Sequence, residues 1–313
     1  MFVQFLNSLP NTVTQGVIWG ILAIGVYLTY KILNIADMTV DGSIVTGMAV
    51  CAVLMTAGWN VWPAMLVATL AGMLAGLVTA VFHTFMGIPA ILAGILTQLI
   101  LWSVNLKIMG SANVTLPART YKVLLTQMLK TRSLLIIIPF ALVLIGLLYW
   151  FFGTEIGRAF RATGCNPDMS RAQGINTRMM TILGLALSNG IVALAGALLC
   201  QFQGYSDINS GRGAIVVGLA AIIIGEALFS RIARNFAVRL LTVIAGGIIY
   251  YLVYQIVIFL GLDADLLKML SALVVALFLA VPYWRNKVRA GKPIGINPAK
   301  LQDPTPEEVE HDA

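Results

Sequence analysis

The sequence predicts an all-α integral membrane protein with about eight to nine transmembrane helices and a short helix outside the bilayer. Of its 313 residues, 59% are hydrophobic and only 11% are charged, and the mean hydropathy is +0.90. A soluble domain would carry about a quarter charged residues. Apolar stretches of about 20 residues, long enough to cross a bilayer, recur along the chain. In lipid the backbone of such a stretch must pair with itself, so each stretch is expected to be a helix.

Nine apolar stretches define the expected spans, and polar or glycine-bearing turns separate them. Gly42 and Gly47 would allow the second span to be broken rather than continuous. Residues 1–285 then form a transmembrane domain, and residues 286–313 form a polar cytoplasmic tail that we expect to be disordered. We place the spans at 11–31, 39–57, 62–83, 88–106, 133–152, 179–201, 213–230, 239–260 and 266–284.

Lysine and arginine set the expected orientation in the cytoplasmic (inner) membrane, because inner segments are enriched in both. If the segment 153–178 lies inside, thirteen of the 20 Lys and Arg residues fall on inner segments and seven on outer ones. The N-terminus is then outside and the C-terminus is cytoplasmic. On this interpretation the net charge of +7 reflects a basic inner face, and we expect no nucleic-acid partner.

The polar, arginine-bearing segment 153–178 separates the fifth and sixth spans. Asn166 can cap a helix by accepting a backbone N–H, and Pro167 suits the first helical position. Asp168 favours the positive end of a helix, and Gly174 suits the left-handed residue that ends one. We therefore expect about two turns of helix on the cytoplasmic side. This coupling region is either the segment through which a soluble ATPase moves the fifth and sixth spans, or an amphipathic loop at the lipid headgroups.

Three separated motifs resemble those of ABC-transporter permeases of the branched-chain amino acid and sugar type. They are YKILNIADMTVDGS over 30–43, GRA-x-RA-x3-N-x5-A-x-GI over 157–175, and GRG followed by AAIIIG over 211–225. A fourth stretch, IMGSAN over 108–113, resembles a subgroup whose permeases are linked to tryptophan- or tyrosine-type substrate-binding proteins. The resemblance covers most of residues 12–285.

The resemblance implies the transmembrane subunit of a binding-protein-dependent importer for an amino acid, with an aromatic one implied by the subgroup. Two copies would form a homodimer, each copy seated on a cytoplasmic ABC ATPase, and an extracytoplasmic binding protein would deliver the substrate for alternating access. The chain has no G-x-x-x-x-G-K-[ST] phosphate loop, so ATP and Mg²⁺ are expected in the ATPase, and this chain is expected to be no enzyme. The family's coupling role carries onto Arg158, Arg161, Asn166, Pro167, Asp168, Arg171 and Gly174.

A set of polar and aromatic residues is expected to form a translocation path or gate. For the two acids of this set, the alternative is capping of the second span, where the helix dipole favours an anion. Near the inner mouth they could instead line the path, or hold a gate through Lys31. The two tyrosines share a helix face and could stack on an aromatic solute, or simply pack in the core. The set is Asn34, Asp37, Asp41, Ser43, Tyr250 and Tyr254.

Glycines recur at seven-residue intervals in the seventh span, at Gly211, Gly218 and Gly225. Small residues let helix backbones approach closely in lipid. Packing within one subunit and a role in the dimer or path both remain open. At the inner end of this span we expect Glu226 to pair with an arginine of segment 231–234. The outer loops around 107–132, 202–212 and 262–268 are the expected contacts of the binding protein.

Two other classes of protein make different demands on the sequence. An ion-coupled secondary carrier for a small polar solute would place acids at the midplane of several spans, commonly with inverted repeats. Here the acids cluster at predicted span ends. A membrane enzyme would need a nucleophile–base or metal constellation, and the chain offers two His residues and three scattered Cys residues. We therefore expect no metal site.

Overall fold

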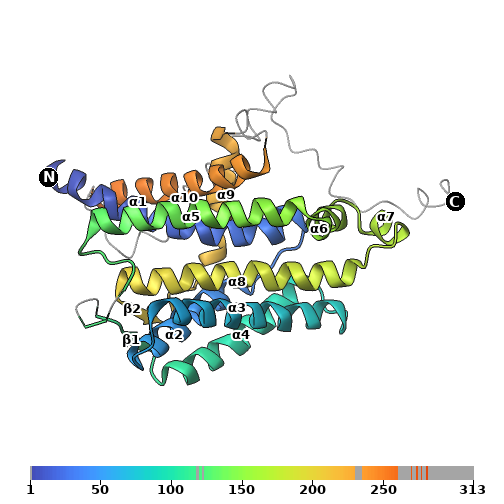
Figure 1. Cartoon of the computed structure of the whole chain (residues 1–313), viewed down its shortest axis with the longest axis horizontal. Helices are drawn as coiled ribbons and strands as arrows, with labels where there is room; N and C mark the ends of the chain where they lie inside the picture. Colours follow the sequence, from blue (N-terminus) through green and yellow to red (C-terminus); the bar gives the residue numbers. More distant parts are fainter. Residues whose placement is uncertain are drawn as a thin grey trace.

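The computed structural model describes residues 2–117, 120, 121, 123–229 and 235–259, together with the isolated positions 269, 273, 276 and 280. Most of its long helices run side by side along one long direction (Figure 1). The elements are α1 (Phe2–Tyr27), a π-helix (Leu28–Ile32), α2 (Val40–Thr56), α3 (Val61–Thr84), α4 (Ala90–Met109), β1 (Asn113–Thr115), α5 (Lys130–Gly153), α6 (Glu155–Cys165), α7 (Pro167–Ala172), α8 (Thr177–Gln203), β2 (Tyr205–Asp207), α9 (Ala214–Phe229) and α10 (Phe236–Phe259).

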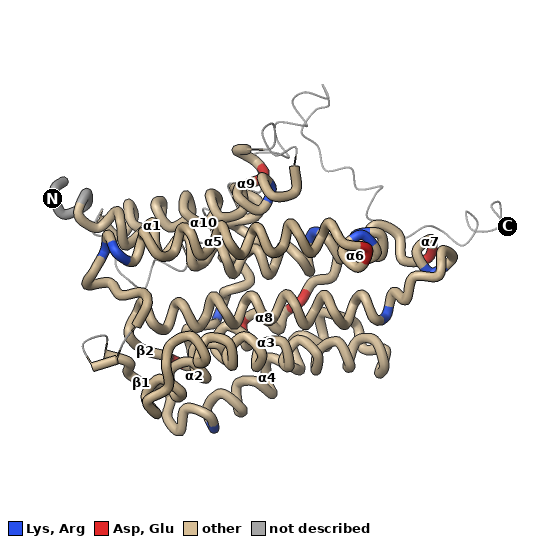
Figure 2. The backbone as a smooth tube through the Cα atoms, in the orientation of Figure 1, with Lys and Arg blue, Asp and Glu red and all other residues tan. Residues whose placement is uncertain are grey.

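Among the described residues, six helices are long and apolar enough to cross a membrane, namely α1 with its π-helix, α3, α4, α5, α8 and α10. Two shorter apolar helices, α2 and α9, add to them. Each of the first eight predicted spans overlaps one of these helices. The ninth predicted span, 266–284, and the predicted tail, 286–313, lie outside the described residues. Charged residues are sparse along the bundle, and α6 and α7 carry both signs at one end (Figure 2).

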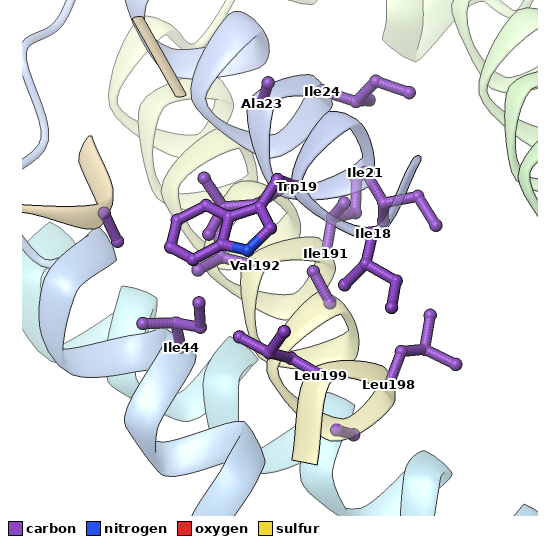
Figure 3. Close-up of a cluster of buried hydrophobic side chains, with 14 of the residues drawn as sticks. Ile18, Trp19, Ile21, Ala23, Ile24, Ile44, Ile191, Val192, Leu198 and Leu199 are labelled. Atoms are coloured by element: carbon purple, nitrogen blue, oxygen red, sulfur yellow. The ribbon is translucent and has the colours of Figure 1, made fainter. Parts of the chain in front are cut away.

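Helix α8 lies at the centre of the fold, because small residues let three neighbours pack closely on it. A Cβ on Gly47 of α2 would collide with the carbonyl of Ala193, and a Cβ on Gly196 would collide with the carbonyl of Ile44. The apolar part of α8 is 78% buried, against 22% for that of α5. Side chains of α1, α2 and α8 fill the space between these helices (Figure 3).

Helices α2 and α9 both begin inside the bundle rather than at its end. Near the start of α2, Ser43 bonds to Asn189, which is close to the middle of α8. The chain from residue 33 to residue 39 is not helical, so the break precedes α2. Gly42 and Gly47, which would allow a break, instead lie within continuous helix and pack closely on neighbours.

Two short strands close the end of the bundle opposite α7. Strand β1 pairs antiparallel with β2, with Asn113 opposite Asp207 and Thr115 opposite Tyr205. The chain then turns back into the bundle, where Gly211 packs against the backbone of Asp41. Only the first part of the predicted outer loop 202–212 therefore lies at the β end, and its last residues lie beside the start of α2.

Candidate functional site

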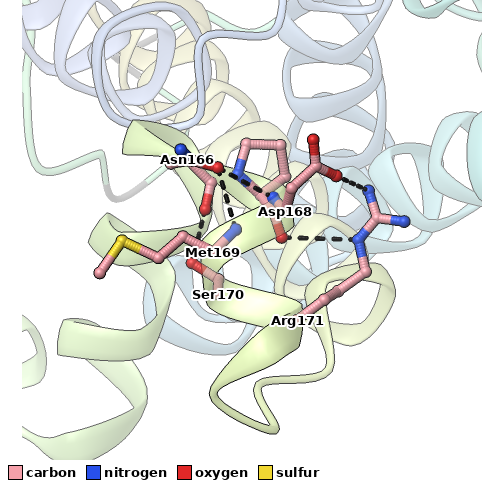
Figure 4. A network of polar contacts seen from close by, with 6 residues as sticks. Asn166, Asp168, Met169, Ser170 and Arg171 are labelled. Atoms are coloured by element: carbon pink, nitrogen blue, oxygen red, sulfur yellow. Dashed lines mark hydrogen bonds and ion pairs between the residues drawn. The ribbon is translucent and has the colours of Figure 1, made fainter.

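The predicted coupling segment folds as two helices, α6 and α7, beyond the ends of α5 and α8. The Oδ1 atom of Asn166 accepts hydrogen bonds from the backbone N–H groups of Asp168 (3.1 Å) and Met169 (3.0 Å) (Figure 4). Pro167 is the first residue of α7, and Gly174, just after the helix, has a φ of +82°. These are the cap, first residue and left-handed terminator that the sequence predicts. The longer helix α6 is missing from the prediction.

Helix α7 presents nearly all of its side chains to the outside. Ser170 is its buried residue, and its hydroxyl donates to the Asn166 carbonyl (2.8 Å). Arg171 and Asp168 form an exposed ion pair (2.9 Å). Between them on the chain, Met169 is 61% exposed. Sequence reasoning missed Met169, although a methionine inside a short polar helix is itself a signal of an apolar contact surface.

Helix α6 anchors this segment to the bundle. A Cβ on Gly164 would collide with the carbonyl of Ile32, so α6 lies directly on the end of the π-helix. Phe160 is fully buried, and its ring meets that of Phe152 edge-on at 5.4 Å. The Arg161 guanidinium lies 4.5 Å from the centre of the Phe236 ring. Arg161 thus packs between helices, whereas the Arg158 side chain is exposed.

A cavity of about 590 Å³ opens at the α7 end, between α7, the first turn of α8, the end of α3 and residues 33–35. Of the predicted path residues, Asn34 lines this cavity. Lys31 does not meet the two aspartates in the structure; its ammonium group pairs with Glu226 at 2.9 Å. The predicted arginine partners of Glu226, in 231–234, lie outside the described residues.

A buried polar network joins the start of α2 to α8. Asp37 is only 2% exposed, and its carboxylate accepts from the backbone N–H of Thr39 (2.9 Å) and from the Asn189 amide (2.7 Å). The Asn189 Oδ1 atom accepts from the Ser43 hydroxyl (2.6 Å). We call Asp37, Thr39, Ser43 and Asn189 the central polar network. A buried polar group is costly unless it is hydrogen-bonded, so these contacts fix the position of the start of α2.

Asp41 caps a helix, although not the second span in which it lies. Its carboxylate accepts from the backbone N–H groups of Gly213 and Ile215, both at 2.9 Å, at the start of α9. The first turn of a helix carries unpaired N–H groups and a partial positive charge, which an acid satisfies. One side chain therefore joins two helices that start inside the bundle.

The predicted tyrosines lie where α10 packs against α1. The Tyr251 ring is 5.8 Å from the Trp19 ring, 5.5 Å from that of Tyr250 and 5.8 Å from that of Tyr254. Tyr250 is buried and Tyr254 is partly buried. These contacts are those of a packed aromatic cluster, and a path role for the pair stays a prediction.

The three glycines of the α9 region each approach a different element. Gly211 packs on the Asp41 backbone, Gly218 on side chains of α1, and Gly225 on the α10 backbone at Thr242. All three contacts lie within one chain, and a further role in a dimer or path stays a prediction. Within the described part of the chain, no three His, Cys, Asp or Glu side chains gather closely enough to hold a metal ion.

Comparison with known proteins identifies the family of this chain. The family described as branched-chain amino acid transport system, permease component, matches residues 8–282. Over 275 residues the chain is 38% identical to the tyrosine transport system permease protein of Clostridioides difficile, covering 88% of this chain and 91% of that one. Over 235 residues it is 31% identical to the autoinducer 2 import system permease protein LsrC of Salmonella typhimurium, covering 71% and 64%. No solved structure matches the chain.

Proposed function

The chain belongs to the permease family of branched-chain amino acid transport systems, and from this membership we propose that it is the membrane subunit of a binding-protein-dependent amino acid importer. Members are permease components of ABC transport systems, which makes this chain a multi-pass inner-membrane protein and a transport subunit. The family also implies ATPase and binding-protein partners. The name of the tyrosine permease relative supports an aromatic amino acid, and tyrosine first, as the solute.

The observation that carries the proposal is the exposed helix α7. It is capped at both ends by its own residues, so its shape does not depend on a partner. Its apolar Met169, flanked by an ion pair, would fit a groove on a soluble ATPase. Asn166, Pro167 and Gly174 would hold the helix in shape, and Arg161 would anchor α6 to the bundle. We place this end in the cytoplasm and the N-terminus outside.

The connections of α7 suggest how ATP could drive transport. Helix α7 joins α5 through α6, and it joins α8 through a short turn. Because α8 packs closely on α2 and α3, a pull on α7 would tilt the centre of the bundle. ATP and Mg²⁺ would bind to the ATPase, and a second copy of this chain would complete the path. Closure of the ATPase would shift the population toward the outward-open state, and hydrolysis would reverse it.

Reconstitution tests the proposal directly. Proteoliposomes holding this chain with its ATPase and binding protein should accumulate tyrosine when ATP is supplied. Met169→Glu should lower ATP-driven uptake more than tenfold, because it places a carboxylate in the apolar contact. Met86→Glu is the matched control, since Met86 is 63% exposed at the same end, in the turn between α3 and α4.

Two outcomes would contradict this proposal. Wild-type uptake by Met169→Glu, with both partners bound, would exclude α7 as the contact through which the ATPase acts. Uptake that follows a pH or sodium gradient without ATP would instead support an ion-coupled secondary carrier.

A further inference from the structure

Arg212 lies alongside the middle of an apolar helix. Its guanidinium stacks on the ring of Trp102, 4.9 Å from the ring centre, and Trp102 is the thirteenth of the twenty residues of α4. Both side chains are exposed on the surface of the chain. Among the described residues Arg212 makes no ion pair. A cation at this depth in a membrane protein is costly, and it usually faces a water-filled path or a polar partner.

A small cavity beside this arginine is lined by a residue with an unsatisfied acceptor. The cavity has a volume of about 50 Å³ and is lined in part by Gln98, Trp102, Asn105 and Arg212. Asn105 is 1% exposed, and its amide nitrogen donates to the Gly42 carbonyl at 3.3 Å. Its Oδ1 atom is buried and accepts no hydrogen bond within the described part of the chain. Such an acceptor costs free energy until a donor reaches it.

The cavity is lined by a cation and by hydrogen-bond acceptors. Arg212 supplies a planar cation that can pair with a carboxylate through two hydrogen bonds. Asp41, which also lines the cavity, and the Asn105 Oδ1 atom supply acceptors. Such a lining is complementary to a small zwitterion. The anionic group of the zwitterion can pair with the cation, and its cationic group can donate to the acceptors.

We propose that this cavity binds the charged end of an α-amino acid in transit, with Arg212 pairing with the carboxylate and Asn105 Oδ1 accepting from the ammonium group. The proposal rests on the amino acid importer function proposed above. A cavity of about 50 Å³ is too small for a whole aromatic amino acid. The solute's side chain would therefore stay outside it, on the exposed surface of α4 beside Trp102. This surface would then face the path rather than lipid.

Cysteine protection tests the proposal on the chain bound to its ATPase in lipid nanodiscs. Gln98→Cys places a thiol in the cavity lining, and Cys165→Ser removes the exposed native thiol, since Cys51 and Cys200 are buried. Tyrosine at about ten times its dissociation constant should slow maleimide labelling about tenfold, because only about a tenth of the sites would then be empty. Tyramine, which lacks the carboxylate, should protect much less. Direct binding of tritiated tyrosine to the chain without the added cysteine gives the same comparison independently.

Variants test whether Arg212 is the cause of the protection. Arg212→Gln should lower tyrosine binding about tenfold, so that the same tyrosine concentration slows labelling only about twofold. Lys107→Gln, which removes an exposed cation from α4 outside the cavity, should change neither. Equal protection by tyrosine and tyramine, or protection that Arg212→Gln leaves unchanged, would overturn the proposal.

The outcomes also distinguish failure of this binding site from failure of the proposed importer function. Uptake without protection would leave the importer standing and remove the cavity from the path. Protection that depends on Arg212, without ATP-driven uptake, would keep the binding site and reject the importer.

Discussion

In the middle of the bundle, the Asn189 amide is buried between Asp37 and Ser43, whereas at the α7 end the Asn166 amide is exposed and bonds to the backbone of its own helix. The same side chain therefore holds separate elements together in one region and shapes a single short helix in the other. In the central polar network, the polar groups are used inside the fold. In α7 the cap and the buried Ser170 are used in this way, and the exposed side chains, Met169 among them, can meet another molecule.

Glycines differ between the same two regions. Gly47 has an ordinary helical backbone, but a Cβ there would collide with Ala193 of α8. Gly174 has open space around it, and what it contributes is a φ of +82°. Gly47 is thus required because its neighbours leave no room for a Cβ. Gly174 is required because its own backbone is left-handed. The comparison teaches that substitutions in the centre should affect the whole fold, while those in α7 should act locally.

The largest expected effect is that of Gly47→Ala. The added Cβ meets backbone atoms of α8, which cannot rotate away, so we expect a loss of about 3 kcal/mol in the free energy of unfolding. Thermal unfolding of the purified chain in detergent should show a clearly lower midpoint. Gly146→Ala in α5 is the control, because its Cβ would have nothing within 4 Å. An unchanged midpoint for Gly47→Ala would mean that α2 and α8 can separate at little cost.

A smaller loss is expected for Asn189→Ala. The change leaves one Asp37 oxygen and the Ser43 hydroxyl without their partner, at a cost of about 2 kcal/mol. The same thermal measurement checks it, and Asp37→Ala in the same chain should cost less when Asn189 is already absent. If the two losses simply add, the side chains do not act as one network.

The smallest effect on stability is expected for Asn166→Ala, which removes the cap of α7. The loss is about 1 kcal/mol and confined to this helix, so the unfolding midpoint of the chain should hardly move. ATP-driven uptake should nevertheless fall several-fold, because a frayed α7 fits its partner less well. Asn166→Ser, which retains a capping oxygen, should restore uptake. A variant that keeps full uptake while hydrogen exchange shows α7 frayed would separate helix shape from coupling.

Local signals explain what could be predicted from the sequence. Apolar length predicted the eight helices, and the Asn166, Pro167 and Gly174 signals predicted both ends of α7, because each feature depends on residues close in the chain. The motifs around 30–43 and 157–175 led to the right permease family. The resemblance of 108–113 to the tyrosine-type subgroup is likewise confirmed by the tyrosine permease relative.

Contacts between distant segments explain what could not be predicted from the sequence. Asp41 looked like a cap for its own helix, and its partners lie more than 170 residues further along the chain. The same holds for the ion pair of Lys31 with Glu226, which joins the π-helix after α1 to α9. Arg212 was assigned to an outer loop because nothing in its neighbourhood shows that the chain turns back toward α2. Helix α6 was missed because its amphipathic pattern is short and rich in glycine and arginine.

The π-helix at the end of α1 sets the rotational phase of the chain that follows it. The N–H of Leu33 bonds to the carbonyl of Leu28, five residues back, so this turn contains one residue more than an α-helical turn. A return to α-helical spacing would rotate the following residues by about 100° about the helix axis. Lys31 would then leave Glu226, and the segment leading to Asp37 would emerge on another side of α1. One inserted residue thus determines which face of the bundle receives the start of α2.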